Sequence, residues 1–420
     1  MTLLADLLST VFERRYLPTR AVKADGRPFQ ALTVELMGTS SEISGQTVAH
    51  QILDRYIGWD DDEKMSFFIH LAEDMTISPE AVRAALESYE RGQTRESYRV
   101  FMTTAEPPRQ EFIRRLNQVP GATHLLVRMR EDLLRLGKET ASLQALDLDF
   151  RHLFASWFNR GFLVLRPINW ESPAHILEKI IAYEAVHTIS SWDDLRRRVQ
   201  PADRRCYAFF HPAMPDEPLI FVEVALTSGV PGSVQDLLAE DRDVISAAEA
   251  DTAVFYSISN CQAGLAGISF GNSLIKQVMA DLAIEVAGLK TSVTLSPIPG
   301  LTAWLATEKI TTDPSDGPRM RALAAAYLLS AKRSDGLPVD SVARFHLGNG
   351  ALLHQLHADA DLSENGMAQS GGVMVNYLYD PGKVSANHER FATRRTIAAS
   401  AEIRALHTSA KKMLSGELGA

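Results

Sequence analysis

Residues 254–305 read VFYSISNCQAGLAGISFGNSLIKQVMADLAIEVAGLKTSVTLSPIPGLTAWL, and they show what kind of fold to expect. The stretch opens with an apolar run typical of a buried strand. A loop with three glycines follows, and then a segment with helical spacing of apolar residues. A second short strand leads into a turn in which two prolines fix the backbone beside a hydroxyl. Because N–H groups at the start of a helix attract phosphate oxygens, this order predicts a phosphate-bearing ligand at the loop and chemistry at the turn.

Bulk composition narrows the class of protein. The chain has 420 residues, which favours two domains. Its formal charge of −9 argues against a nucleic-acid-binding protein, which would usually present a basic face. No apolar run reaches the length that a membrane span needs. Only Cys206 and Cys261 occur, so we expect neither a disulfide framework nor a zinc site, and a cytoplasmic location fits.

Helical spacing dominates the first part of the chain. Residues 3–12, 60–74 and 123–136 each carry an apolar stripe at i, i+3/4 and i+7. Proline and glycine breaks separate such segments, and no convincing strand occurs before about residue 160. We therefore predict an all-helical bundle over residues 1–158.

The remaining residues, 159–420, mix strand and helix patterns. Residues 205–210 and 219–226 are rich in aromatic and β-branched side chains and flank a turn, which predicts a hairpin. Residues 254–259 and 374–379 predict further strands. Together with the helical bundle, this mixed α/β catalytic domain makes the predicted fold class α+β.

The glycine loop does not fit the common nucleotide-binding motifs. Gly264, Gly267 and Gly271 have the wrong spacing for the dinucleotide fingerprint G-x-G-x-x-G, and no Gly-Lys-Ser/Thr follows. The order strand, phosphate loop, helix instead resembles the acyl-CoA site of the GNAT-type acyltransferase fold. The mixed domain is therefore expected to be GNAT-like.

Further segments make a resemblance more specific. They are residues 255–259 (FYSIS), 295–300 (LSPIPG), 345–351 (FHLGNGA) and 374–377 (MVNY), followed by Tyr379. In this order, over about residues 150–390, they resemble the malonyl-CoA decarboxylase family. The resemblance implies a helical domain followed by a GNAT-like catalytic domain, an activity that converts malonyl-CoA into acetyl-CoA and CO2, and a homotetramer in which the helical half serves assembly.

The resemblance also implies which residues form the site. Ser296 in the SPIPG turn and His346 in the FHLGNGA segment take the positions of the family's catalytic serine and histidine, and Tyr379 that of a tyrosine near the site. The loop implied to hold the CoA pyrophosphate comprises Ala266, Gly267, Ile268, Ser269, Phe270, Gly271 and Asn272. Ser269 stands where the family has a glutamate, so we give Ser269 no catalytic role.

Decarboxylation of a malonyl thioester explains why such residues would be needed. Loss of CO2 leaves negative charge that spreads onto the thioester oxygen, so the substrate is its own electron sink and no cofactor or metal is expected. Hydrogen-bond donors aimed at that charge contribute about 3–4 kcal/mol each. His346 suits this role or that of proton donor, because histidine titrates near neutral pH. Ser296 can bind the departing carboxylate, and Tyr379 and Asn349 could complete the shell.

Alternatives stay open at this point. An acetyl-CoA-dependent N-acyltransferase would share the loop, and a non-catalytic acyl-CoA sensor would bind without turnover. His354 and His357, spaced for one helical face and near two aspartates, allow a metal hypothesis without a recognised ligand pattern. The arginines at 196–198 and 204–205 form either a solvated face or a contact for the 3′-phosphate of CoA.

Overall fold

The computed structural model describes residues 26–268 and 274–417, which form two compact units. The helical unit comprises residues 26–164, 210–219 and 262–268. The sheet unit comprises residues 165–209, 220–261 and 274–417. The domain boundary that we placed after residue 158 stays a prediction. Residues 210–219 and 262–268 come later in the chain, but they group with the helical unit by their contacts. The helix expected over residues 3–12 lies outside the described residues.

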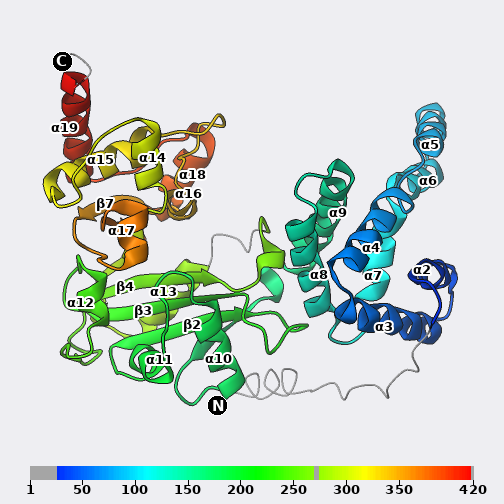
Figure 1. Ribbon diagram of the computed structural model, residues 1–420, viewed down its shortest axis with the longest axis horizontal. Coiled ribbons are helices and arrows are strands. Elements are labelled where there is room, and N and C mark those ends of the chain that lie inside the picture. The colour runs from blue at the N-terminus through cyan, green and yellow to red at the C-terminus, as the bar shows by residue number, and fades with distance from the viewer. Residues whose placement is uncertain (1–25, 269–273, 418–420) are drawn as a thin grey trace. The chain divides into compact units, whose positions relative to one another are not determined.

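The helical unit is built from the α-helices labelled in Figure 1. In chain order they are α2 (Phe29–Gly38), α3 (Glu42–Gly58), α4 (Asp61–Glu73), α5 (Pro79–Arg91), α6 (Arg95–Ala105), α7 (Pro108–Leu116), α8 (Ala122–Leu136) and α9 (Ala141–Trp157). Most of them bury apolar side chains in a common core, to which α5 and α6 contribute none. Phe67, Phe112 and Phe150 are fully buried in that core. The described residues before Val164 form no strand, so the prediction of a helical first part is confirmed for them.

The sheet unit is organised around one mixed sheet of eight strands. The strands are β1 (Val164–Ile168), β2 (Arg204–Phe210), β3 (Ile220–Thr227), β4 (Thr252–Asn260), β5 (Thr291–Thr294), β6 (Ser296–Pro297), β7 (Leu352–His357) and β8 (Met374–Leu378). Their order is β1-β2-β3-β4-β5-β8-β6, with β7 also paired to β8. The β2–β3 hairpin is antiparallel as predicted, and β4 and β5 run parallel. The predicted α+β class is confirmed.

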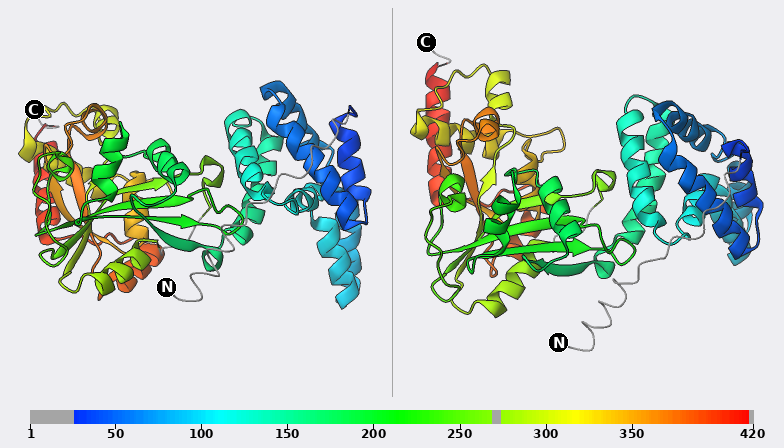
Figure 2. Two further views of the ribbon diagram at one scale, coloured as in Figure 1. Left: turned by 90° about the horizontal axis from the view of Figure 1, so that it is seen from below. Right: turned by 60° about the horizontal axis from the view of Figure 1, so that its bottom comes forward.

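Helices connect and cover these strands. They are α10 (Ala174–Tyr183), α11 (Trp192–Val199), α12 (Val234–Leu238), α13 (Leu274–Glu285), α14 (Leu301–Thr307), α15 (Gly317–Ser330), α16 (Ser341–Gly348), α17 (Glu364–Ser370), α18 (Val384–Arg394) and α19 (Ala401–Glu417). The predicted helix after the glycine loop is α13, which joins β4 to the parallel β5. The C-terminal helix α19, red in Figure 2, packs along α15 through small residues such as Ala326 and Ala410.

Candidate active site

A cavity of about 250 Å³ opens where β4 and β5 part. The two strands pair from Thr252 to Phe255, but β4 continues to Asn260 while β5 ends at Thr294. One wall consists of Val186, Ile220, Phe255, Tyr256, Ile258 and Asn260. The other consists of Ser296, Pro297, Ser341, Val342, Phe345 and His346. A mostly apolar cavity with a few polar groups on one wall is the usual form of a small-molecule site.

Ser296 reaches this cavity from the proline-rich turn after β5. As part of β6, it pairs with Val375 of β8, so its backbone position is fixed by the sheet. Its hydroxyl donates to Thr294 Oγ1 at 2.8 Å and lies 3.3 Å from His346 Nε2. Its side chain is buried, yet it lines the cavity. The turn that the sequence singled out therefore does place a hydroxyl beside an imidazole.

His346 lies in α16 and is held on both sides. Its Nδ1 lies 2.8 Å from the hydroxyl of Tyr379, and the ring of Tyr377 stacks on the imidazole at 4.5 Å between centroids. Burial lowers the pKa of His346 to about 3, so the imidazole is neutral near neutral pH. This removes the sequence-based reason for a proton-donor role, which assumed titration near neutral pH.

The hydrogen bonds also indicate where the protons lie. Burial raises the pKa of Tyr379 well above its ordinary value, so the phenol stays protonated and can donate to Nδ1 of His346. A neutral imidazole that accepts at Nδ1 carries its proton on Nε2. Because the Ser296 hydroxyl donates to Thr294, its oxygen is free to accept from that Nε2–H. The row Tyr379–His346–Ser296 thus presents a neutral N–H donor at the cavity wall.

The first part of the predicted CoA loop lies in the helical unit. Arg130, almost fully buried, donates through Nη1 to the carbonyls of Gly264 and Ala266 at 2.7 and 2.9 Å. A Cβ on Gly264 would stand 1.9 Å from the carbonyl oxygen of Val127, so only glycine fits. Gly267 has φ of +74°, which also favours glycine. These contacts fix the loop as far as Ile268, and its role in binding CoA stays a prediction.

The rest of that loop prediction falls outside the described residues. Ser269, Phe270, Gly271 and Asn272 belong to the undescribed segment 269–273. Asn349, which the sequence suggested for the shell of the site, ends α16 and donates its side-chain amide to the carbonyl of Phe345 at 2.8 Å. It does not line the cavity.

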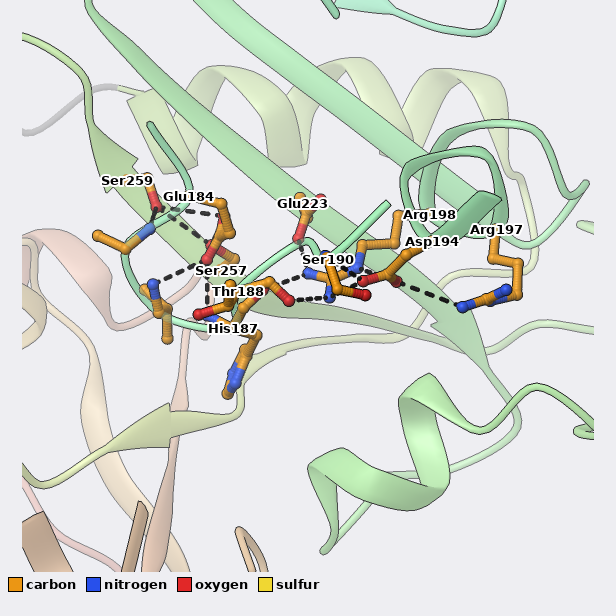
Figure 3. A network of polar contacts seen from close by, with 12 residues as sticks. Glu184, His187, Thr188, Ser190, Asp194, Arg197, Arg198, Glu223, Ser257 and Ser259 are labelled. Carbon is orange, nitrogen blue, oxygen red and sulfur yellow. Dashed lines mark hydrogen bonds and ion pairs between the residues drawn. The ribbon is translucent and has the colours of Figure 1, made fainter. Parts of the chain in front are cut away.

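Sequence reasoning missed a buried carboxylate that shapes the apolar wall (Figure 3). Glu184 accepts from the N–H groups of Val186 and His187, each at 2.8 Å, and from the Ser257 hydroxyl at 2.7–2.8 Å. Ser259 of β4 adds a hydroxyl at 3.3 Å. One side chain therefore ties the segment after α10, including the cavity residue Val186, to the edge of β4. Its signal in the sequence was only the alternate serines of β4.

The interpretation of the arginines as a solvated face is wrong for Arg198 and Arg204. Both are buried, because each completes a polar network inside the sheet unit. Arg198 donates to Asp194 at 3.1 Å and lies 3.4 Å from Glu223 (Figure 3), and Arg204 donates to the carbonyl of Leu237 at 2.6 Å. Burial raises the pKa of Glu223 to about 8. These two guanidinium groups are engaged, which leaves them poor candidates for the 3′-phosphate of CoA.

The histidines considered for a metal do not share a helix. His354 and His357 lie in the strand β7, and the register shift between Leu353 and Gln355 places His354 in an irregular part of that strand, so the assumed helical spacing was wrong. His357 Nε2 contacts Asn376 Oδ1 at 2.5 Å. Within the described ranges, no group of three or more His, Cys, Asp or Glu side chains is arranged to hold a metal ion.

Comparison with known proteins decides the family. The sequence model of the malonyl-CoA decarboxylase C-terminal domain matches residues 161–317 and 314–416, and that of the N-terminal domain matches residues 76–158. Mitochondrial malonyl-CoA decarboxylase of Anser anser anser is 33% identical over 385 residues, which cover 78% of this chain and 74% of that protein. The chain belongs to the malonyl-CoA decarboxylase family.

Solved structures of the family agree. The malonyl-CoA decarboxylase of Rhodopseudomonas palustris superimposes with a TM-score of 0.84 at 48% identity and covers 89% of this chain and 98% of its own. That of Agrobacterium vitis has a TM-score of 0.84 at 47% identity, covering 90% and 98%. The sequence-based family assignment, and with it the class carboxy-lyase, is confirmed.

Proposed function

We propose that this chain removes CO2 from malonyl-CoA and yields acetyl-CoA. The observation that carries the proposal is the row Tyr379–His346–Ser296, which presents a neutral N–H donor and a hydroxyl at one wall of a largely apolar cavity. This arrangement suits a reaction in which negative charge moves from a carboxylate to a thioester oxygen, and the family membership supplies the substrate class.

The chemistry follows from the charges. When the bond between the α-carbon and the carboxylate breaks, its electron pair moves towards the thioester oxygen and CO2 leaves. The Nε2–H of His346, which points at Ser296 Oγ in this structure, would turn to that oxygen as charge builds up, and a neutral donor avoids the cost of a buried cation. The α-carbon then takes one proton, so each turnover consumes one proton. Ser296 lies where it can orient the carboxylate before it leaves.

The open edge of β4 supports binding of an extended arm. Among the described residues, β4 pairs with no strand on the side of β5 beyond Phe255, although the backbone of Tyr256 contacts the His187 side chain there. Unpaired strand edges accept extended chains that carry amides. We propose that the amide-containing arm of CoA lies along this edge and leads the thioester to Ser296. That the glycine loop 266–272 holds the CoA pyrophosphate is a separate proposal, which comes from the family resemblance.

Purified chain incubated with malonyl-CoA tests the activity, with CO2 and acetyl-CoA as the measured products. Ser296→Ala and His346→Ala should each lower kcat by about 10²-fold or more, the usual loss when one such donor is removed. The matched control is Ser330→Ala, because Ser330 pairs with His407 at 2.7 Å on the exposed surface of α15 and α19. Full turnover in the folded Ser296 and His346 variants would refute the assignment.

The same assay separates the alternative functions. CO2 release without an added amine excludes an obligatory N-acyltransferase, which would need an acceptor. Tight binding of malonyl-CoA without any product would instead identify a sensor.

We also propose that turnover needs no cofactor, since the thioester itself accepts the electrons. Loss of activity after exhaustive dialysis, if a metal or an organic cofactor restored it, would contradict this proposal.

Assembly and location are further parts of the proposal. The hairpin of α5 and α6 exposes large apolar side chains, namely Leu86, Tyr98, Val100 and Met102, and α6 buries none of its own. We propose that this surface meets further copies of the chain in a homotetramer, which light scattering would measure.

No helix among the described residues has the length and apolarity to cross a bilayer. Both cysteines are free thiols, which fits the cytoplasm.

A further inference from the structure

The ladder that joins β8 to its neighbours is interrupted at Thr294. β8 pairs with Val293 and with Ser296, which lie on either side of Thr294. The residue opposite Thr294 in this register is Tyr377, yet these two described residues form no ladder pair. The N–H of Tyr377 donates to the side-chain oxygen of Thr294, Oγ1, at 3.1 Å. A hydroxyl thus stands where a backbone acceptor would be expected in a regular antiparallel ladder.

The backbone of Thr294 is held by the next residue of β8. The side-chain amide of Asn376 donates through Nδ2 to the carbonyl of Thr294 at 2.8 Å, and its Oδ1 lies 2.5 Å from His357 Nε2. Thr294 and Asn376 are both fully buried. Any other rotamer of Thr294 would leave the N–H of Tyr377 without its acceptor, which is costly inside a protein. The position of Thr294 Oγ1 is therefore fixed by two consecutive residues of β8.

The oxygen fixed in this way accepts the proton of Ser296. Ser296 Oγ donates to Thr294 Oγ1 at 2.8 Å. A hydroxyl has one proton to donate and two lone pairs that accept. Because its proton goes to Thr294, Ser296 faces His346 Nε2, 3.3 Å away, as an acceptor.

The other end of the imidazole agrees with this direction. The hydroxyl of Tyr379 lies 2.8 Å from Nδ1 of His346, which is its one hydrogen-bond partner within the described ranges. A buried hydroxyl with a single partner that can accept donates to it. Each group in the row Tyr379–His346–Ser296 thus donates to the next, and Thr294 Oγ1 ends the row.

We propose that Thr294 is a positioning residue for decarboxylation: it takes the proton of Ser296 and so keeps His346 in the tautomer that carries its hydrogen on Nε2. Thr294 does not line the cavity, so it acts through Ser296 and not on the substrate. The inference rests on the proposed function for its kinetic consequence alone. With the hydrogen on Nδ1, the lone pair of Nε2 would face the growing negative charge of the thioester oxygen and repel it.

Thr294→Val and Thr294→Ser separate the hydroxyl from the shape of the side chain. In Thr294→Val the Ser296 proton loses its acceptor, and the next acceptor in reach is His346 Nε2. We expect kcat for malonyl-CoA to fall by about 10²-fold, the usual loss when one donor to developing charge is removed. We expect KM to change by less than about threefold, because the donor acts in the transition state. Thr294→Ser keeps the hydroxyl and should keep kcat within about threefold of the unaltered chain.

Thr252→Val is the matched control. Thr252 is also buried in the sheet, in β4, and its hydroxyl donates to Asp251 Oδ1 at 2.7 Å. It is not among the residues that line the cavity. The same change of threonine to valine should therefore leave kcat and the tautomer of His346 as they are.

Nitrogen-15 NMR of the imidazole reads the tautomer without any measurement of activity. The signals of His346 are those that disappear in His346→Asn. The unaltered chain and Thr294→Ser should carry the hydrogen on Nε2, whereas the signals of Thr294→Val should shift towards those of hydrogen on Nδ1. Hydrogen on Nδ1 in the unaltered chain would overturn the proposal, and this test stands even if Thr294→Val does not fold.

Two further outcomes would also overturn it. One is a folded Thr294→Val with the tautomer of the unaltered chain, and the other is a Thr294→Ser as slow as Thr294→Val. If the unaltered chain released no CO2, the proposed function would fall, while the tautomers of the unaltered chain and of Thr294→Val would still decide the inference.

Discussion

Protonation of His346 should make the sheet unit lose stability in acid. An unfolded histidine titrates near 6.5, whereas burial lowers the pKa of His346 to about 3 in the folded chain. The stabilising neutral form is fully present above pH 6.5, and its contribution is lost as pH falls from 6.5 towards 3. A pH of 5 lies about 1.5 units below the pKa of an unfolded histidine, and each unit is worth about 1.36 kcal/mol. At pH 5 the free energy of unfolding should therefore be lower by about 2 kcal/mol.

Urea unfolding of the unaltered chain and of His346→Asn, each at pH 8 and pH 5, measures this loss. Other histidines, such as the buried His187 and the half-buried His354, also have lowered pKa values, but they are present in both proteins and cancel in the difference. The unaltered chain should lose about 2 kcal/mol more than the variant between the two pH values. Equal losses in the two proteins would show that the imidazole is not held neutral, and the mechanism built on a neutral donor would fail.

Further predictions concern the loop, the apolar wall and the imidazole. Gly264→Ala should destabilise the helical unit by about 1–3 kcal/mol in thermal unfolding, because the new methyl group meets a carbonyl of α8, whereas Gly92→Ala, with open space around it, should not. Glu184→Gln can keep both N–H groups on its amide oxygen but presents an NH2 in place of an acceptor to the Ser257 and Ser259 hydroxyls, so unfolding should cost about 1–3 kcal/mol less and KM should rise more than kcat falls. Tyr379→Phe leaves Nδ1 of His346 without its donor, and kcat should fall by about 10-fold or more with little change in KM; unchanged kinetics would remove Tyr379 from the site.

Local patterns were enough to predict most of the fold. The β-branched and aromatic runs at 205–210, 219–226 and 254–259 became β2, β3 and β4, because such side chains fit a pleated surface, and here both faces of these strands are largely buried. The helix after the glycine loop followed from its apolar period. These signals are read within about ten residues, so they do not depend on what the rest of the chain does.

The site was harder because its parts are distant in the sequence. Order and residue identity pointed to Ser296 and His346, but the neutral state of the imidazole arises only when α16, β6 and β8 bury it together. The same holds for Arg198, whose charge suggested solvent until α11 packed it near Glu223. The only sequence signal for Glu184 was the alternate serines of β4, and they lie more than seventy positions away from it.

The central claim is that one malonyl thioester lies between the Ser296 hydroxyl and the neutral imidazole of His346. A crystal structure of the chain with a malonyl-CoA analogue that cannot lose CO2 tests this most directly. The account predicts the thioester oxygen within about 3.2 Å of His346 Nε2 and the carboxylate mimic beside Ser296 Oγ. An acyl group bound outside the cavity at the parting of β4 and β5, with both side chains still paired to each other, would contradict it.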